Sequence, residues 1–484
     1  MHRLIVLSLF MLAMTFAANA LAGEGHKEKY PWGKAYMFRV WLKDKSSTPF
    51  SLQEPQKFLS AKALARRKRQ DIAVDSTDLP VSPIYIKKIE EAGAEIASKS
   101  KWNNTLLVWV RDRGVIDSIA NLKFVEKTRP AWTSPDSIDE RTGRLRYHDE
   151  LELRDTARQT FYGVAVEHIA MLDGIKLHRA GFTGKGMTIA VLDGGFMNAD
   201  RIPCLANANI AGYADFVYPK SKNIFAEMDH GTKVLSVMAV NEPYKYVGTA
   251  PDAAYWLLRC EDNTTESIAE EDFWAAAAEF ADSVGVDIIS SSLGFHDFDN
   301  RTDNYRYAQL DGHTALISAT ASMLADKGII LINSAGNDGM AAWKKVNVPA
   351  DADNIITVGA ASPNRRNAAF SSIGPTADGR VKPDLMALGS STSVITGRGT
   401  IIKDVGTSFA TPIISGMTAC LWQALPWKTA KEMISLMRKC GDNYATPDNI
   451  YGYGIPDFGK AYETEKANDG NLRAKNLHKT IKRH

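Results

Sequence analysis

The chain has 484 residues, of which 45% are apolar and 24% are charged, and its formal net charge at pH 7 is +2. This length and apolar content allow a large buried core and predict two domains. The nearly balanced charge gives no reason to expect nucleic acid as a partner. The basic cluster at residues 66–69 is short and flanked by helix formers, so we interpret it as a solvated helix face.

The N-terminus has the pattern of a secretory signal peptide. His2 and Arg3 precede an apolar run over residues 4–18, and the cleavage motif Ala20-Leu21-Ala22 follows. The run is shorter than the roughly 20 residues that span a bilayer, so a cleaved signal is favoured over a membrane anchor. We therefore expect residues 1–22 to be removed and the remainder to be exported, to a periplasm or out of the cell, without membrane attachment.

The four cysteines do not argue for disulfides, although export would permit them. Four cysteines can pair in three ways. Cys260 ends a strand-like run and Cys420 lies in an apolar helical run, so buried free thiols are at least as good an interpretation. Cys204 and Cys440 complete the set. Their spacing matches no zinc site, and we expect no metal ligands among them.

Residues 23–133 predict a small α+β domain with its own core. The apolar patterns predict strands over residues 36–43, 106–110 and 124–127, and helices over residues 56–69, 82–92 and 116–121. The pattern then changes to a charged stretch with little apolar periodicity. We expect residues 134–162 to be an exposed linker, where proteolysis tends to occur.

From residue 163 to residue 462, apolar strands alternate with helices. Predicted strands are 188–192, 253–259, 287–291, 329–333, 355–358 and 385–387, and predicted helices are 232–240, 270–283, 314–326, 408–423 and 428–439. This alternation predicts an α/β domain, in which helices cover both faces of a doubly wound, mostly parallel sheet. Residues 463–484 form a polar tail that we expect to be frayed.

Polar residues that carry chemistry lie at the ends of these predicted elements. Asp193, Ser292 and Asn337 each fall just beyond a strand, where sites gather in parallel sheets. Ser408 begins an apolar helix, whose free N–H groups and dipole favour developing negative charge. In isolation, Thr407 or Ser408 would be interpreted simply as an N-cap residue. We expect Pro412 in the first helical turn, where its missing N–H costs nothing.

Asp193, His230 and Asn337 supply what Ser408 would require to act as a nucleophile. A serine hydroxyl needs an adjacent base, which His230 can provide, and the base needs a carboxylate to orient it, which Asp193 can provide. The oxyanion of the tetrahedral intermediate needs donors, such as the Asn337 amide and the Ser408 backbone N–H. The chain order is Asp193, His230, Ser408.

These four stretches resemble the subtilisin-like serine peptidases (subtilases), whose triad has this order. The resemblance covers about residues 174–462 and includes the segments 291–294 and 382–385. It implies a serine endopeptidase that acts on protein or peptide substrates through an acyl-enzyme and needs no cofactor. It also implies that residues 23–133 are a propeptide, which assists folding, occupies the cleft as an intramolecular inhibitor and is removed by self-processing.

The resemblance also places the substrate. An extended peptide would pair with backbone near Ser292, Leu293 and Gly294, and the pocket for the residue before the cut would be walled by Ser334, Ala335 and Gly336. Asp338 could favour basic residues in that pocket, although a solvated loop acid is the preferred interpretation. The acidic loop 297–303 could hold a structural calcium ion, but it lacks the twelve-residue calcium pattern.

Two positions depart from the family pattern. The residue after the aspartate is usually Ser or Thr, which can hydrogen-bond the carboxylate, and here it is Gly194, so that donor must come from elsewhere. A second histidine often follows His230 by three residues, and here Lys233 stands there. A catalytically impaired binding module is therefore the alternative. A dinucleotide site is rejected because residues 193–198 lack the glycine fingerprint.

Overall fold

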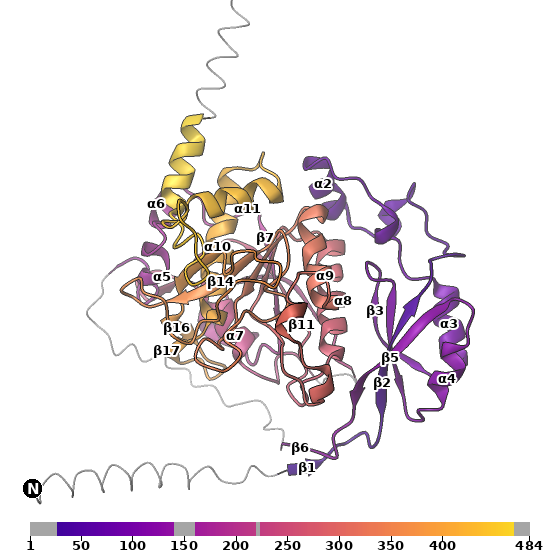
Figure 1. The fold of residues 1–484 in the computed structure, drawn as a ribbon. Coiled ribbons are helices and arrows are strands. Elements are labelled where there is room, and N and C mark those ends of the chain that lie inside the picture. Colours follow the sequence, from indigo (N-terminus) through magenta and orange to yellow (C-terminus); the bar gives the residue numbers. More distant parts are fainter. Residues whose placement is uncertain (1–26, 140–159, 219–222, 469–484) are drawn as a thin grey trace, which may run out of the picture.

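A computed structural model describes residues 27–139, 160–218 and 223–468 of the chain. The expected signal peptide, most of the expected linker and the end of the tail lie outside these ranges. Within them the chain forms two units that lie side by side (Figure 1). The smaller N-terminal unit contains a four-stranded sheet, and the larger unit is built on a seven-stranded sheet.

The seven-stranded sheet is entirely parallel, and its strand order is β15-β14-β13-β12-β7-β11-β8. The strands are β7 (Thr188–Asp193), β8 (Asn209–Asp215), β11 (Ala254–Arg259), β12 (Ile288–Ser291), β13 (Ile330–Ser334), β14 (Ile356–Ala361) and β15 (Leu385–Leu388). The chain starts in the middle of the sheet, builds one side and then returns to build the other. The order therefore reverses between β7 and β12, which is where ligands bind in sheets of this kind.

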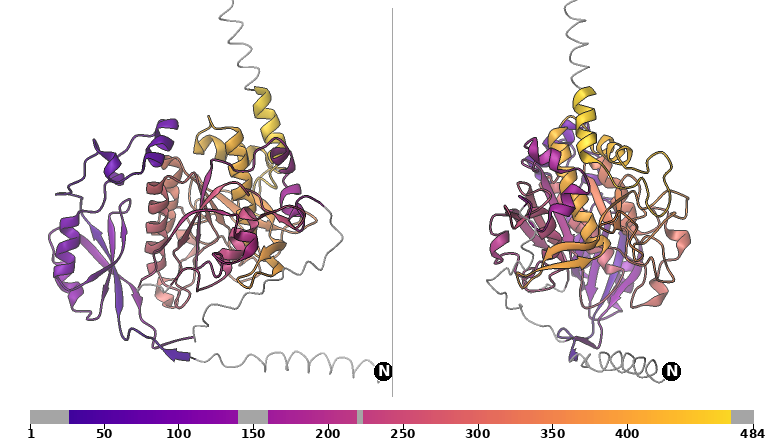
Figure 2. Two further views of the ribbon diagram at one scale, coloured as in Figure 1. Left: turned by 180° about the vertical axis from the view of Figure 1, so that it is seen from behind. Right: turned by 90° about the vertical axis from the view of Figure 1, so that its left-hand side faces the viewer.

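Helices cover both faces of the sheet, which confirms the doubly wound α/β prediction (Figure 2). In β7, Ile189 and Val191 face a core that includes α7 (His230–Ala239) and α10 (Thr407–Ala424). Ala190 and Leu192 face the opposite core, which includes α8 (Ala269–Val284) and α9 (Leu316–Met323). The alternation follows from the two-residue period of a strand.

Shorter elements complete the larger unit. They are α5 (Val166–Ala170), α6 (Ile175–Arg179), α11 (Ala430–Lys439), β9 (Asn241–Glu242), β10 (Tyr246–Val247), β16 (Ser390–Ile395) and β17 (Ile401–Val405). The last described residues, 458–468, are helical, so the polar tail expected from residue 463 begins inside a helix.

Pro412 does not lie in the first turn of α10, and the expectation that it does is wrong. It lies well inside this helix, where a proline cannot donate to the carbonyl four residues earlier. That carbonyl belongs to Ser408, and it accepts a hydrogen bond from Ser292 Oγ at 2.8 Å instead. The Ser292 side chain, just after β12, thus replaces the missing helical donor. It also links Ser408 to the carboxyl end of that strand.

The N-terminal unit confirms the predicted α+β fold. Its antiparallel sheet has the order β3-β4-β2-β5. The strands and helices are β2 (Tyr36–Leu42), α2 (Ala61–Arg69), α3 (Pro83–Glu91), β3 (Glu95–Ser100), β4 (Thr105–Val110), α4 (Val115–Ala120) and β5 (Val125–Thr133). Strand β6 (Ser137–Asp139) pairs with β1 (Lys27–Lys29), so ordered pairing continues into the stretch expected to be a linker.

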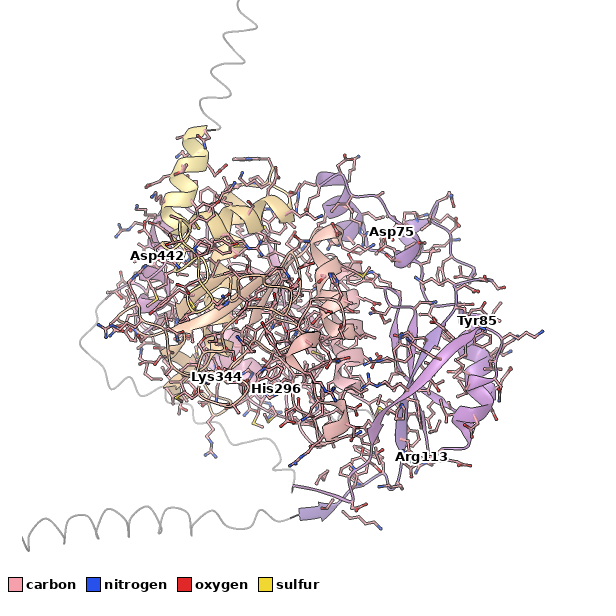
Figure 3. All side chains as sticks on the ribbon, viewed as in Figure 1. Asp75, Tyr85, Arg113, His296, Lys344 and Asp442 are labelled. Carbon is pink, nitrogen blue, oxygen red and sulfur yellow. The ribbon has the colours of Figure 1, made fainter. Side chains whose placement is uncertain are left out.

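The two faces of this small sheet have different partners. Phe38 and Val40 of β2 belong to the unit's own core with α3 and α4 residues. Met37 belongs to the core shared with α8, which stands between the two sheets in Figures 1 and 2. In Figure 3, Asp75 lies on the side next to the larger unit, where it binds Lys327, and Tyr85 lies on the far side.

The basic cluster at residues 66–69 is a solvated helix face only at Lys68 and Arg69, so the interpretation is wrong for Arg66 and Arg67. Arg66 and Arg67 are 2% and 1% exposed, and both bind Asp282 of α8. Their position in α2 places them at the junction of the two units. The sequence pattern could not show this, because their acidic partner lies more than two hundred residues further along the chain.

Other sequence expectations can be compared with the described residues. All four cysteines are free, and three of them are buried. No helix in the described part of the chain is long and apolar enough to cross a membrane. The described residues contain no group of three or more His, Cys, Asp or Glu side chains that could hold a metal ion. In the acidic loop, Asp303 binds Arg129 of the N-terminal unit.

Candidate active site

Asp193 and His230 form the centre of the candidate site. Asp193 is the last residue of β7 and is fully buried. His230 is the first residue of α7, and its Nδ1 lies 3.0 and 2.9 Å from the two carboxylate oxygens of Asp193. This contact fixes the imidazole ring and leaves Nε2 for a substrate or a nucleophile, as a general base requires.

The turn after Asp193 supplies a hydrogen-bond donor to the Asp193 carboxylate, in place of the Ser or Thr side chain that position 194 lacks. The backbone N–H of Gly194 donates to Asp193 Oδ1 at 2.8 Å. The Gly194 carbonyl accepts from Arg259 Nε at 3.0 Å and from Asn263 Nδ2 at 2.9 Å. The peptide is thus held in place by residues at and beyond the end of β11, which keeps its N–H directed at the carboxylate.

Ser408 lies in the first turn of α10 and is 8% exposed. Its Oγ donates to the Ser292 carbonyl at 3.4 Å. Ser408 and His230 both lie in the described part of the chain, and no hydrogen bond joins them in this structure. The aromatic ring of Phe409 packs against the His230 ring with centroids 5.7 Å apart, so α10 and α7 hold the two residues beside the same cleft. Catalytic hydrogen bonds are often long in unliganded enzymes and tighten with substrate.

Asn337 is oriented by the residue next to Ser408. The Asn337 Oδ1 accepts from the Thr407 backbone N–H at 2.9 Å and from Thr407 Oγ1 at 3.0 Å. With Oδ1 occupied, the amide Nδ2 is left as the free end of an exposed side chain. No described residue accepts a hydrogen bond from Nδ2, so this donor is available to an oxyanion.

A cleft of about 330 Å³ joins these side chains. All of the site residues expected from the sequence line it, except Asp193 and Ala335. Asp193 lies behind His230. Ala335 is fully buried, and its backbone N–H donates to Val358 O at 2.9 Å, so it supports the wall without facing the cleft. No described residue of the N-terminal unit lines this cleft.

The structure adds three lining residues that the sequence analysis missed: Met228, Glu261 and Asn347. Glu261 follows β11 closely, so the rule that selected Asp193, Ser292 and Asn337 could have found it. Met228 and Asn347 lie in irregular segments and carry no pattern that marks a cleft.

Charges in the cleft shift the pKa values of two facing groups. Burial lowers the pKa of His230, but the Asp193 carboxylate and its hydrogen bond raise it by more, to about 9. Burial raises the pKa of Glu261, and the neighbouring Asp193 charge raises it further, to about 7, against the opposing effect of His230. The cleft therefore contains one strongly oriented base and one carboxyl group that ionises near neutral pH.

The two remaining charged candidates are engaged in contacts. Asp338 Oδ1 lies 3.4 Å from His296 Nε2, and Asp338 Oδ2 accepts from Asn347 Nδ2 at 2.9 Å. The hydrogen bond from His296 lowers the pKa of Asp338. Lys233, which stands where the family often has histidine, binds Asp404 of β17 at 3.1 Å. The Lys233 side chain thus points toward the antiparallel pair of strands β16 and β17.

The fold and the site place an aspartate, a histidine, a serine and an asparagine together at the carboxyl ends of the strands of a parallel α/β sheet. A family model described as the subtilase family matches residues 184–454, and one described as the peptidase S8 propeptide domain of Bacteroidota matches residues 37–144. The chain therefore belongs to the subtilase family, and its N-terminal unit corresponds to a propeptide domain of that family.

Individual relatives are distant in sequence. Subtilisin NAT of Bacillus subtilis subsp. natto is 29% identical over 54% of this chain and 62% of its own length. Subtilisin of Bacillus pumilus is 29% identical over 59% of this chain and 94% of its own length. Serine protease AprX of Bacillus subtilis (strain 168) is 30% identical over 56% of this chain and 65% of its own length. The chain thus spans less than two thirds of the length of two of these three relatives.

A solved structure shows the same fold. The MycP3 protease from the type VII (ESX-3) secretion system aligns with a TM-score of 0.50 and 20% identity. The alignment covers 63% of this chain and 90% of that protein. At this identity the likeness concerns the fold alone.

Proposed function

We propose that this chain is an exported serine endopeptidase that is made as a self-processing precursor. The observation that carries the proposal is the contact between Asp193 and His230 at the edge of a cleft that also contains Ser408 and Asn337. Those four groups would be the orienting carboxylate, the base, the nucleophile and the oxyanion donor of one acyl-transfer reaction. Membership of the subtilase family supports the same reaction.

In the proposed reaction Ser408 Oγ attacks the scissile carbonyl carbon while His230 Nε2 takes the hydroxyl proton. The Asn337 amide and the Ser408 backbone N–H bind the oxyanion. His230 then gives its proton to the leaving amine, so the peptide C–N bond breaks and an acyl ester forms. Water, deprotonated by His230, hydrolyses the ester and restores Ser408. Asp193 keeps the ring orientation and stabilises the imidazolium throughout.

Labelling with a fluorophosphonate tests this proposal directly, because the reagent modifies an activated serine. The wild-type protein should be labelled and should cleave a peptide library, whereas Ser408→Ala should do neither. Adding His230→Ala to Ser408→Ala should cost little more, because triad members act as a unit. A folded wild-type protein that is neither labelled nor active would instead be a binding module that keeps the fold.

Export and processing are part of the proposal. The signal pattern at residues 1–22 and the match of residues 37–144 to a propeptide domain support them. The N-terminal unit would act as an intramolecular inhibitor before its release. The expected products are a mature protein that begins after the N-terminal unit, and a separate N-terminal fragment.

A further inference from the structure

Glu261 differs from Asp193 and Asp338, the other two carboxylates of the site, in having no hydrogen-bonding partner among the described residues. Asp193 binds His230 and the Gly194 N–H, and Asp338 binds His296 and Asn347. No described residue donates a hydrogen bond to the Glu261 carboxylate, although the residue lines the cleft and is partly buried. A partly buried carboxylate without partners is costly, which favours a ligand group that would pair with it.

The space for this carboxylate depends on the glycine after Asp193. A Cβ atom at position 194 would lie 2.5 Å from Glu261 Oε2 and 2.8 Å from Asn263 Oδ1. The serine or threonine that relatives usually carry there would therefore displace the Glu261 side chain from its position. The absence of a side chain at Gly194 thus leaves the space that the Glu261 carboxylate occupies.

The sheet order determines which part of a substrate Glu261 would meet. Glu261 follows β11, Ser292 follows β12 and Asn337 follows β13, while β7 lies between β11 and β12. Glu261 and Asn337 therefore lie at opposite ends of the cleft, with His230 on the Glu261 side. Side chains of an extended peptide alternate in direction. If the side chain before the cut points to the wall at Ser334 and Gly336, the preceding one points toward His230 and Glu261.

From this arrangement we propose that Glu261 is a specificity-determining residue that selects a lysine or arginine at the second position before the cut. The inference rests on the proposed endopeptidase function and deepens it. The ammonium or guanidinium group of such a side chain would supply the donors that the Glu261 carboxylate lacks. A neutral side chain would leave it unpaired, and an acidic one would be repelled.

The groups around Glu261 set the pH range of this selection. Burial raises the pKa of Glu261 and Asp193 at the end of β7 raises it further, whereas His230 of α7 and Arg259 of β11 lower it. Asp262, the next residue in the chain, also raises it. Burial raises the pKa of Glu266, in the loop before α8, and of Glu270, in α8 itself, and the Glu261 charge raises both further. Because its pKa is about 7, the Glu261 carboxyl is charged above neutrality and mostly uncharged at pH 6.

Three fluorogenic peptides that differ only at the second position before the cut test the proposal. They carry lysine, norleucine or glutamate there, and kcat/KM is measured for the mature wild-type enzyme. At pH 8 we expect lysine to exceed norleucine by about tenfold, which corresponds to ~1.4 kcal/mol, and glutamate to be the poorest. The lysine-to-norleucine ratio should fall toward one between pH 8 and pH 6.

The variant Glu261→Gln should bring the ratio at pH 8 close to one, and Glu261→Asp should keep a preference for lysine. Asp262→Asn is the matched control, because it removes the same charge one residue away. The Asp262 side chain binds Thr264 and Thr265 and does not line the cleft, so this variant should keep the ratio. Fluorophosphonate labelling of each protein shows that its active site is intact.

The outcomes separate the two proposals. A wild-type enzyme that is labelled and cleaves norleucine peptides with no preference for lysine would overturn the role of Glu261 and leave the endopeptidase function standing. A preference that persists in Glu261→Gln, or that does not change between pH 6 and pH 8, would overturn that role as well. A wild-type protein without labelling or cleavage would overturn the endopeptidase function, and the selection of lysine with it.

Discussion

Arg67 Nη2 lies 2.9 Å from Asp282 Oδ2 across the junction between the two units, and neither side chain is more than 1% exposed. Arg66 binds the same carboxylate from the previous position in α2. Burial raises the pKa of Asp282, but Arg66, Lys101 and Arg67 lower it by more, so the carboxylate stays charged. One helix of the N-terminal unit is thus attached to α8 through a single buried anion.

Replacing the Asp282 carboxylate by a neutral amide should strongly destabilise the folded precursor. Asp282→Asn leaves the buried Arg66 without its paired carboxylate and leaves Arg67 with Asp78 alone. Breaking a buried ion pair in this way costs about 3–5 kcal/mol. We expect a loss of this size in the free energy of unfolding, measured by urea denaturation of the Ser408→Ala precursor.

The matched control is Glu54→Gln, which breaks the exposed pair between Glu54 and Lys57 in the same unit. Exposed pairs contribute little, so this variant should unfold like its parent. Equal and small effects of the two substitutions would show that Asp282 does not hold the units together.

A second prediction isolates the oxyanion donor. Asn337→Ala removes the Nδ2 group that the contact with Thr407 leaves available. Because an oxyanion forms only in the transition state, kcat should fall by roughly 10²–10³ with a smaller change in KM. Loss of the oxyanion-hole asparagine of a subtilisin has an effect of this size.

Thr407→Val provides the comparison for Asn337. It removes the Oγ1 bond to Asn337 but keeps the backbone N–H, so kcat should fall much less than in Asn337→Ala. If Asn337→Ala raised KM and left kcat unchanged, the side chain would be binding ground-state substrate and would not be an oxyanion donor.

A third prediction concerns the pH dependence of His230. The base must be neutral to accept the Ser408 proton, and Asp193 raises its pKa from 6.5 to about 9 against the effect of burial. The kcat/KM for a neutral peptide should therefore increase as the pH rises toward 9. Glu261→Gln removes a neighbouring negative charge, so it should shift this increase to lower pH.

The same shift has a consequence for stability. A histidine whose pKa is raised in the folded state binds its proton more tightly there than in the unfolded chain. The contribution is complete below pH 6.5 and is lost as the pH rises through about 9. Asp193→Asn should abolish this contribution of His230 to stability. It should also lower kcat by roughly 10⁴, the effect of the same substitution in another serine protease. An activity profile that is centred near pH 6.5 and unchanged in Asp193→Asn would contradict this assignment.

The parallel sheet was predictable because its strands are buried on both faces. Continuous apolar runs such as 188–192 and 329–333 stand out between amphipathic helices. Strands β8, β16 and β17 were missed because they carry mixed or polar sequences, and β8 lies at an exposed edge of the sheet. Their place is set by neighbours distant in the chain, and local periodicity does not record such neighbours.

The candidate site was predictable where a motif and a strand end coincide, as at Asp193 and Asn337. The contacts that orient these residues were not predictable. The Thr407 bonds to Asn337 and the Ser292 bond to the Ser408 carbonyl depend on how α10 approaches the sheet. The position of Pro412 was misjudged for the same reason, because its missing donor is replaced by a residue from another element.

The last prediction concerns maturation, and the structure narrows the interval in which the precursor should be cut. The sequence places the cut between Ser134 and Gly163, which includes ordered backbone at both ends. Residues Ser137–Asp139 pair with β1, and Gly163 is held against Lys245, whose carbonyl would lie 2.1 Å from a Cβ at position 163. Paired and buried backbone resists proteolysis, so the mature N-terminus should fall within residues 140–161.

N-terminal sequencing of wild-type and Ser408→Ala proteins provides the measurement. The wild-type protein should yield a new N-terminus in that interval, because its own active site cuts there. Ser408→Ala should lose only the signal peptide and remain a precursor from Gly23 onward. The separated N-terminal segment, added back, should inhibit the mature enzyme, and Asp282→Asn in that enzyme should weaken the inhibition because the Arg66 and Arg67 contacts are lost. A fully active wild-type enzyme that still carried residues 36–129 covalently would show that this unit is an accessory domain instead.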